Sequence, residues 1–418
     1  MQYILKAPSL LDSTVDLPSS KSISNRALII NALAGNDKMP ANLSDCDDTD
    51  VMVNALTNSP YEVDIKAAGT AMRFMTAFYS IQPGQEHVLT GTERMRHRPI
   101  GILVDALRRL GADIRYVDED GFPPLLIRGC SLDGGYIEIP GSTSSQFVSA
   151  LLLIAPAMAE GLRLRLTGTI ISRPYIDLTL WMMREMGADA EWADFETIVV
   201  KPQRYRRHEY YIENDWSAAS YWYEMMALSK NADNEVRLVG LMDGSKQGDS
   251  SVRYIFSLLG VKTTFLPAGG NGTSTVVLRH SGHSLSNIEY DFSGSPDLAQ
   301  TVVVCCALNG VHFRFVGLST LKVKETDRIE ALKTELRRLG YVIHSVGDDE
   351  LYWDGERCDA DIDHGIDTYE DHRMALAFAP ASLCISGLVI NNPGVVTKSY
   401  PHYWEDLKRC GFSIDIRQ

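Results

Sequence analysis

The sequence predicts a two-domain α/β protein built from a sixfold repeat. The chain has 418 residues, which is longer than one hydrophobic core usually serves, and its 45% apolar and 22% charged residues are typical of a globular protein. A glycine recurs at a regular interval, directly after a helix-like run. Short strand-like segments lie between these runs, so each repeat is predicted to be an α/β module with two helices.

The recurring glycines mark the repeat. Each follows an amphipathic run at the position of a left-handed helix cap and precedes an apolar or strand-like residue. They are Gly111, Gly187, Gly260, Gly340 and Gly411, spaced 76, 73, 80 and 71 residues apart. One unit without this glycine comes first, with TDVMVNAL as its helix. Six units of roughly seventy residues therefore account for the whole chain.

A second series of helices runs out of phase with the first. Each begins at a turn rich in Ser, Thr, Asn or Asp, in the segments 19–33, 68–79, 141–153, 213–228, 293–308 and 368–379. Segments such as GYIEI and TIVVKP between the helices are predicted strands. Polar turns are also how ordinary helices begin. If the six turns converge, however, their free N–H groups and positive dipole ends would form a trap for anions.

Composition excludes several classes of protein. A formal net charge of -14 argues against nucleic acid as the main partner. The seven cysteines form no CxxC pair and no metal-ligand spacing with histidine, so we expect free thiols, with Cys305 and Cys306 in the core. The apolar stretch from Phe147 to Ala159 is too short to span a bilayer and is predicted to be a buried helix. The amino terminus lacks a secretory signal pattern, which indicates a cytoplasmic protein.

Several basic residues stand in the polar turns. Lys21 and Arg26 flank Ser22 and Ser24 at the start of an apolar helix, a pattern that suits a phosphate but also fits a solvated basic turn. The glycine spacing of a nucleotide-binding P-loop is absent from this turn. Further along the chain, Gly69 would permit close backbone approach to a ligand.

The remaining turns add donors and charges. Arg98 belongs to a cluster with Arg94 and Arg96, and the repulsion among these like charges must be reduced by solvent or by a bound anion. Ser144, Ser145 and Gln146 enter one helix as uncharged donors.

The carboxyl-terminal half supplies most of the remaining charges. Lys324 and Arg328 are four apart and are predicted to share a helix face, next to Glu325. Arg373 stands at a helix start, and Lys398 is isolated in an apolar loop, where a lysine is usually a surface residue.

Together these motifs resemble one family closely, the 5-enolpyruvylshikimate-3-phosphate synthases. The resemblance spans nearly the whole chain in the family's order, through SKSISNRAL, NLSDCDDTD, AGTAMR, RMRHRPIGILVDALRRLGA, GSTSSQF, SRPYID, QGD, SPDLA, VKETDR, EDHRMA and TKSYP. It implies a two-domain inside-out α/β barrel with six βαβαββ repeats, three per domain, and an active site in the interdomain cleft. It also implies that residues 1–19 join residues 214–418 in one domain, with residues 20–213 inserted between them.

The resemblance implies roles for individual residues by motif position. Shikimate 3-phosphate would be held by Lys21, Ser22, Arg26, Ser144, Ser145, Gln146, Ser172, Asp297 and Lys324. Phosphoenolpyruvate would be held by Lys21, Gly69, Arg98, Gln146, Arg328, Arg373 and Lys398. Both substrates carry phosphate and carboxylate groups, which explains a demand for cations in an acidic protein.

The implied reaction is transfer of the enolpyruvyl group to the 5-hydroxyl of shikimate 3-phosphate, with release of phosphate, in chorismate and aromatic amino acid biosynthesis. Asp297 would take the hydroxyl proton and either Glu325 or Lys21 would protonate C3, through a tetrahedral intermediate that is not bound covalently to the protein. For Asp297 an ordinary helix-capping role remains the alternative. The implied reaction requires no metal or organic cofactor, and the family precedent favours a monomer, while composition already argues against a nucleic-acid or membrane partner.

The sequence departs from the family's usual pattern at Ala67, Phe74 and Thr320, and these positions bear on sensitivity to glyphosate, the inhibitor of this family. One rival is the related transferase that acts on UDP-N-acetylglucosamine, but the cysteine that it places before its RP dipeptide is absent from GTERMRHR. A second rival is a non-catalytic anion-binding relative. Retention of Asp297 and Glu325 speaks against it, since carboxylates repel anions.

Overall fold

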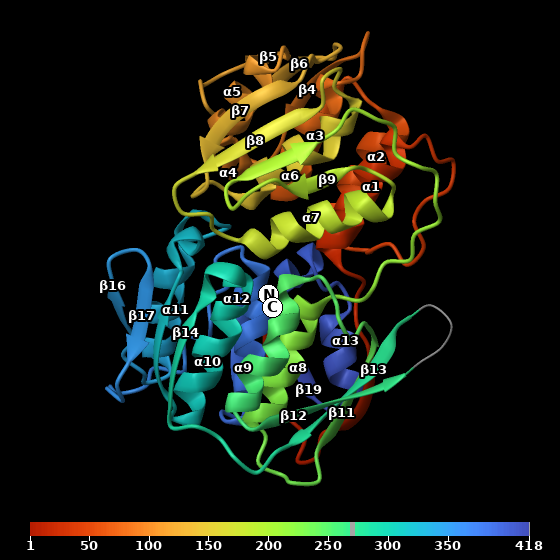
Figure 1. Ribbon diagram of the computed structural model, residues 1–418. Coiled ribbons are helices and arrows are strands. Elements are labelled where there is room, and N and C mark those ends of the chain that lie inside the picture. The colour runs from red at the N-terminus through yellow and green to blue at the C-terminus, as the bar shows by residue number, and fades with distance from the viewer. Residues whose placement is uncertain (268–271, 418) are drawn as a thin grey trace. The chain divides into compact units, whose positions relative to one another are not determined.

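The computed structural model describes residues 1–267 and 272–417 and divides the chain into two compact units (Figure 1). Met1–Ser19 and Glu213–Gln418 form the discontinuous unit, and Ser20–Ile212 form the inserted unit. Each unit has a hydrophobic core of its own. The chain therefore passes between the units twice, once in each direction.

The inserted unit contains two complete α/β repeats that follow a helical segment. Its elements are α1 (Lys21–Leu33), α2 (Asp47–Asn58), β3 (Glu62–Asp64), α3 (Gly69–Ser80), β4 (Glu86–Thr90), α4 (Glu93–Arg96), α5 (Gly101–Arg109), β5 (Asp113–Tyr116), β6 (Leu125–Arg128), β7 (Gly135–Pro140), α6 (Ser145–Ile154), β8 (Leu162–Thr167), α7 (Arg173–Glu185), β9 (Ala190–Trp192) and β10 (Thr197–Val200).

The discontinuous unit begins with two strands and resumes after the inserted unit. Its elements are β1 (Gln2–Lys6), β2 (Asp12–Asp16), α8 (Trp216–Leu228), β11 (Glu235–Leu241), α9 (Val252–Leu258), β12 (Val261–Pro267), β13 (Ser274–His280), β14 (Asn287–Asp291), α10 (Ala299–Asn309), β15 (His312–Val316), α11 (Arg328–Arg338), β16 (His344–Val346), β17 (Glu350–Trp353), α12 (His372–Phe378), β18 (Leu388–Asn391), α13 (Tyr403–Arg409) and β19 (Ser413–Arg417).

Four sheets share one strand order, which reveals the repeat in three dimensions. They are β3-β4-β6-β5, β7-β8-β10-β9, β2-β11-β13-β12 and β14-β15-β17-β16. In each sheet the first two strands pair in parallel, and the other neighbours pair antiparallel. One helix precedes the second strand and another follows it. The predicted βαβαββ repeat is confirmed.

The two remaining repeats are incomplete versions of the same unit. In the last repeat, Ile366 forms a parallel bridge with Ile390 of β18, and β1 pairs antiparallel with both β18 and β19. The first strand of the chain thus occupies the place of the fourth strand. In the first repeat, which holds α1 and α2, a parallel bridge between Ala41 and Tyr211 stands at the corresponding place.

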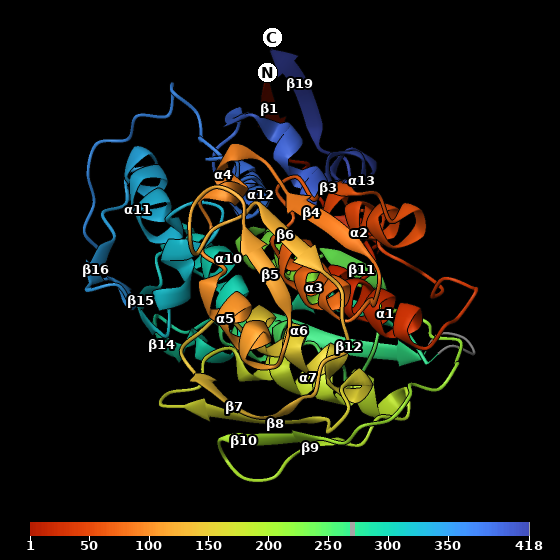
Figure 2. The same ribbon diagram turned by 90° about the horizontal axis from the view of Figure 1, so that it is seen from above.

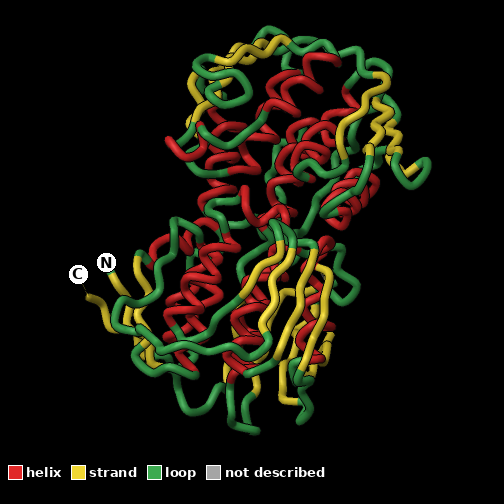
Figure 3. Tube along the Cα trace, turned by 90° about the vertical axis from the view of Figure 1, so that its left-hand side faces the viewer, coloured by secondary structure: helices red, strands yellow, loops and turns green. Residues whose placement is uncertain are grey.

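The first helix of each repeat lies in the interior of its unit. Helices α1, α3 and α6 pack against one another in the inserted unit, and α8, α10 and α12 do so in the discontinuous unit. Figure 2 shows α3 and α6 within the inserted unit, and Figure 3 shows helices between strands in each unit. Phe147 to Ile154 of α6 are all buried, which confirms the predicted buried helix over these residues, but the α-helix ends at Ile154, before Pro156. The inside-out arrangement follows, with helices central and sheets peripheral.

In five of the repeats, the second helix ends just before the predicted glycine. Gly111, Gly187, Gly260, Gly340 and Gly411 all have positive φ, between 82° and 105°. A residue with a Cβ is strained in that conformation, which explains why glycine recurs at this position.

The cysteines match the expectation of free thiols. All seven are free, and Cys305 and Cys306 are buried in α10. Within the described residues, no helix is both long and apolar enough to cross a membrane.

Candidate functional site

In the discontinuous unit, Asp297 lies at the centre of a network of ion pairs. It is the second residue of a short 3-10 helix, Pro296–Leu298, which leads into α10. Its carboxylate lies 3.1 Å from Arg328 Nη1, 3.0 Å from Arg373 Nη2 and 3.6 Å from Lys324 Nζ. The alternative of an ordinary N-cap is wrong, because Ser295 occupies the cap position. The Asp297 side chain bonds to cations instead.

Arg328 joins three carboxylates at the start of α11. It is the first helical residue, after the N-cap Asp327, and its side chain is almost fully buried. Its Nη2 lies 2.9 Å from Glu325 Oε2, and its Nε lies 2.7 Å from Asp371 Oδ2. The expectation that Lys324 shares a face of this helix is wrong, because Lys324 precedes the cap. Lys324 reaches the same place through Asp297.

Lys398 is a buried residue, against the expectation of a surface lysine. It ends a 3-10 helix, Pro393–Lys398, and is 8% exposed. Its Nζ lies 2.7 Å from Glu325 Oε1. Because few lysines are buried unless they are paired, this contact explains how Lys398 is tolerated here.

Arg373 completes the network from α12. Asp371 caps this helix by accepting a hydrogen bond from the Arg373 backbone N–H at 2.9 Å. The Arg373 guanidinium donates to Asp297 at 3.0 Å and to the Tyr221 hydroxyl at 3.3 Å. Six predicted site residues are thereby brought together: Asp297, Lys324, Glu325, Arg328, Arg373 and Lys398.

The charges of the network shift one another's pKa values. Burial alone would raise the pKa of Asp297, but Arg373, Lys324 and Arg328 outweigh it and hold that pKa well below its usual range. Burial likewise opposes the charge of Arg328, but Asp371, Glu325 and Asp297 outweigh it and raise its pKa. Burial lowers the pKa of Lys324, and the neighbouring arginines lower it further, whereas Asp297 acts in the opposite direction. The network therefore strongly favours the ionised form of Asp297.

In the inserted unit, Lys21 is the first residue of α1. The Ser20 hydroxyl caps this helix by accepting from the Ile23 backbone N–H at 3.4 Å. Lys21 Nζ lies 3.2 Å from Asp48 Oδ2, and both side chains are largely buried. A buried carboxylate therefore holds this lysine at a helix amino terminus.

Gly69 and Arg98 are in close contact at the start of α3. A Cβ added to Gly69 would lie 2.7 Å from Arg98 Nη1 and 3.1 Å from its Cζ. The Gln146 side chain donates to the Thr70 hydroxyl at 3.2 Å, which joins the starts of α3 and α6. Three of the predicted phosphoenolpyruvate-binding residues, Gly69, Arg98 and Gln146, thus stand at or beside these two helix starts.

Arg26 forms several hydrogen bonds inside the inserted unit. Its guanidinium donates to Thr179 Oγ1 at 2.7 Å, to Ser149 Oγ at 3.2 Å and to the Ser22 carbonyl at 2.9 Å. It also lies 5.6 Å from the ring centroid of Phe74, one of the positions that depart from the family pattern. Burial lowers the pKa of Arg26 to about 10. This environment fits a residue that fixes α1 against α6 and α7.

The predicted serines stand at helix starts. Ser144 is exposed and caps α6, accepting from the Gln146 backbone N–H at 3.3 Å, and Ser145 begins that helix. Ser172 precedes α7 with φ 54°, a left-handed conformation that is uncommon for a residue with a side chain. Ser22 is the second residue of α1. Each of these serines therefore lies in the first turn of a helix or directly before it.

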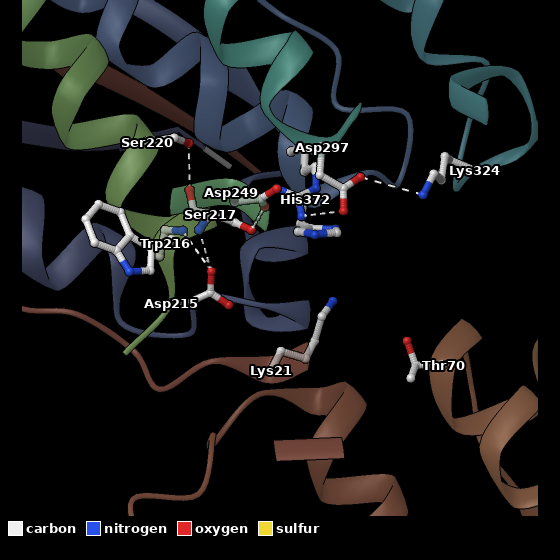
Figure 4. A network of polar contacts seen from close by, with 12 residues as sticks. Lys21, Thr70, Asp215, Trp216, Ser217, Ser220, Asp249, Asp297, Lys324 and His372 are labelled. Carbon is white, nitrogen blue, oxygen red and sulfur yellow. Dashed lines mark hydrogen bonds and ion pairs between the residues drawn. The ribbon is translucent and has the colours of Figure 1, made fainter. Parts of the chain in front are cut away.

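The sequence reasoning assigned no site role to four polar residues of these clusters. Asp48, Asp249 and Asp371 are carboxylates with 3% exposure or less, and Ser217 donates to Asp249 (Figure 4). Each lies in or beside one of the motifs or polar turns given above, but anion binding by itself predicts only cations. Acidic residues that recur beside helix starts were the available signal. Within the described part of the chain, no group of three or more His, Cys, Asp or Glu side chains is arranged to hold a metal ion.

The chain is similar to proteins of one family throughout its length. The sequence model for EPSP synthase (3-phosphoshikimate 1-carboxyvinyltransferase) matches residues 5–58 and 56–407. A curated 3-phosphoshikimate 1-carboxyvinyltransferase of Bacteroides fragilis is 54% identical over 416 residues, covering 100% of this chain and 99% of that protein. One from Aliivibrio fischeri is 35% identical over 433 residues, covering 97% and 98%.

Solved structures share the fold at lower sequence identity. An EPSP synthase from Acinetobacter baumannii has a TM-score of 0.79 at 21% identity and covers 100% of both chains. The enolpyruvyl transferase NikO from Streptomyces tendae has a TM-score of 0.68 at 17% identity, covering 99% of this chain and 98% of that chain.

Proposed function

Because the chain belongs to the EPSP synthase (3-phosphoshikimate 1-carboxyvinyltransferase) family, we propose that it transfers the carboxyvinyl group of phosphoenolpyruvate to the 5-hydroxyl of shikimate 3-phosphate. Phosphate is the second product. The observation that carries the proposal is the position of Asp297, a carboxylate held by Arg328 and Arg373. A proton acceptor surrounded by anion-binding cations suits a reaction between a hydroxyl and a phosphorylated enol.

The residues proposed to bind phosphoenolpyruvate form two groups. The discontinuous unit would supply Arg328, Arg373 and Lys398, which the ion-pair network already holds in place. The inserted unit would supply Lys21, Gly69, Arg98 and Gln146 from helix starts. Phosphate and carboxylate bind well to arginine forks and helix amino termini.

The proposed shikimate 3-phosphate site uses the serine-rich helix starts. Its residues are Lys21, Ser22, Arg26, Ser144, Ser145, Gln146 and Ser172 of the inserted unit with Asp297 and Lys324 of the discontinuous unit. Asp297 and Lys324 are 3.6 Å apart and would place the 5-hydroxyl next to the base. Arg26 would act mainly by fixing α1, because its guanidinium already bonds to Thr179 and Ser149.

The proposed chemistry needs two proton transfers in the addition step and two in the elimination step. Asp297 accepts the proton of the 5-hydroxyl while that oxygen bonds to C2 of the enol, and Glu325 or Lys21 gives a proton to C3. The tetrahedral intermediate then loses phosphate from C2 while the proton held by Asp297 passes to the departing phosphate, and C3 returns its proton to the group that supplied it, which restores the double bond. Arg328, Arg373, Arg98, Lys21 and Lys398 stabilise the charge that gathers on the departing phosphate.

We also propose that the protein acts as a monomer in the cytoplasm on these two small molecules. The residues described above carry the whole chemistry, so no metal ion and no organic cofactor takes part in the proposal. The rival acceptor, UDP-N-acetylglucosamine, is not favoured by the names of the relatives.

Phosphate release tests the proposal directly. The purified protein should release phosphate from phosphoenolpyruvate only when shikimate 3-phosphate is present. Release with UDP-N-acetylglucosamine in its place would assign the chain to the rival activity. An absence of release with either acceptor, in a protein that binds phosphoenolpyruvate, would favour a non-catalytic anion-binding protein.

A further inference from the structure

Asp249 is a buried carboxyl group that the proposed chemistry does not use. It lies in a 3-10 helix, Gly248–Ser251, that precedes α9, and it is 2% exposed. Its Oδ2 accepts a hydrogen bond from the Ser217 hydroxyl at the start of α8 (Figure 4). The Ser217 backbone N–H is in turn held by Asp215 Oδ1 at 2.7 Å. A defined set of bonds therefore fixes the Asp249 carboxyl group in place.

Charged groups from three other elements interact with Asp249. Asp215 caps α8, Asp297 lies in the 3-10 helix before α10, and Arg373 lies on α12 next to His372. The charges of Asp297, Arg373 and Asp215 all act on Asp249. Arg373 also lies 3.0 Å from Asp297. Asp249 and Asp297 thus both interact with the charge of Arg373.

The ionisation of Asp249 is poised near neutral pH. Burial raises its pKa to about 6, and the negative charge of Asp297 adds to this effect. Arg373 and the hydrogen bond from Ser217 oppose it by favouring the charged form. Asp249 therefore changes charge in a pH range where Asp297 stays ionised.

We infer that Asp249 is a positioning residue whose charge sets the strength of Asp297 as a base. This inference rests on the proposed function. An ionised Asp249 repels the charge of Asp297 and attracts Arg373, and both effects make Asp297 hold a proton more readily. When Asp249 is neutral, the cations act on Asp297 without this opposition. The pKa of Asp297 is then lower, and Asp297 is a weaker base. Turnover should therefore fall as Asp249 becomes protonated.

The pH profile of kcat tests this inference. With phosphoenolpyruvate and shikimate 3-phosphate saturating, the parent protein should show an acid limb with a midpoint near pH 6. Asp249→Asn should lack that limb and should turn over roughly three- to tenfold more slowly than the parent at pH 8. Ser217→Ala should move the midpoint to higher pH, because the charged form loses a donor. A purely structural role would lower kcat at all pH values and leave the midpoint unchanged.

Asp243→Asn is the matched control. Asp243 is an exposed aspartate of the same segment, paired with Arg253 at 2.9 Å, and its variant should keep the parent's profile. Circular dichroism and Tm establish that each variant is folded. The inference is overturned if Asp249→Asn keeps the acid limb. If that variant does not fold, an unmoved midpoint in Ser217→Ala overturns it instead.

The same data separate this inference from the proposed function. Parent protein that releases no phosphate at any pH contradicts the proposed function itself. Parent protein that turns over, with an acid limb that survives Asp249→Asn, contradicts only the role of Asp249.

Discussion

Asp371 holds Arg328 by two hydrogen bonds at once, from Nε to Oδ2 at 2.7 Å and from Nη2 to Oδ1 at 3.3 Å. Both side chains are almost fully buried. The same carboxylate caps α12 and so fixes the backbone of Arg373. One aspartate therefore orients two of the arginines proposed to bind phosphoenolpyruvate.

Loss of that charge should weaken both stability and substrate binding. Asp371→Asn keeps an acceptor for the cap but leaves the buried Arg328 without its closest counter-charge. Removing one partner of a buried ion pair costs about 3–5 kcal/mol, so Tm should fall clearly. We expect kcat/KM for phosphoenolpyruvate to fall by about tenfold or more, measured by phosphate release. Glu209→Gln breaks the exposed pair with Lys38 and should change neither quantity. Equal effects of both variants would contradict this assignment.

Asp297→Asn tests the proposed base. The amide keeps the shape of the side chain but cannot accept the hydroxyl proton, so kcat should fall by about 10²–10⁴-fold. The KM for phosphoenolpyruvate should not rise, because Arg328 and Arg373 then have one fewer carboxylate competing for them. Steady-state kinetics at neutral pH distinguish the two effects. Turnover at the parent rate would remove Asp297 from the role of base.

Gly69→Ala should act through Arg98. The new Cβ would lie 2.7 Å from Arg98 Nη1, a distance that forces the guanidinium to move while the backbone can stay. We expect the KM for phosphoenolpyruvate to rise roughly fivefold, which corresponds to about 1 kcal/mol, with Tm nearly unchanged. Gly394→Ala is the control, since a Cβ there meets nothing within 4 Å. A fall in Tm without a change in KM would show that the contact matters for folding instead.

Glu224 should be a source of instability. It is fully buried in α8, and neither carboxyl oxygen has a hydrogen-bond partner among the described residues. Glu224→Met should therefore raise the free energy of unfolding at pH 7 by about 1–3 kcal/mol. Denaturant titration measures this gain. A less stable variant would mean that the carboxyl group has a role in the core.

The gain from Glu224→Met should depend on pH. Burial raises the pKa of Glu224 well above the ordinary value of 4.5. A raised carboxyl pKa favours the folded state at pH values below the unfolded value, and this contribution is lost as pH rises toward the folded value. The difference between variant and parent should therefore grow from pH 4.5 upward. Glu224→Gln should show the same growth with a smaller gain, because it removes the charge and keeps a buried polar group.

The repeat could be predicted because its signals are local. A glycine such as Gly340 follows its helix directly, and polar caps such as Asp371 stand next to the helices that they begin. Helix starts, buried helices and an α/β unit with two helices follow from such neighbours, whereas the βαβαββ order was expected only from the family resemblance. Several cations of the candidate site, among them Lys21, Arg328 and Arg373, were found for the same reason, since they lie in these helix starts.

The partners of those cations could not be predicted, because they come from distant parts of the chain. Asp371 lies 43 positions from Arg328, and Lys398 lies 73 positions from Glu325. Only packing of separate repeats brings such pairs together. The burial of Lys398 illustrates the problem, because a lone lysine in a loop is ordinarily exposed. The motif patterns show which residues are charged but not which charges meet.

Because β1 pairs with both β18 and β19, the sheet that contains it can form only late in the synthesis of the protein. The ribosome makes β1 long before it makes β18 and β19, the two neighbours of β1 in the sheet. The inserted unit, with its own core, can fold while that strand waits. We therefore expect nascent chains that stop before residue 388 to hold one finished unit and a tethered, unpaired segment that chaperones would have to protect.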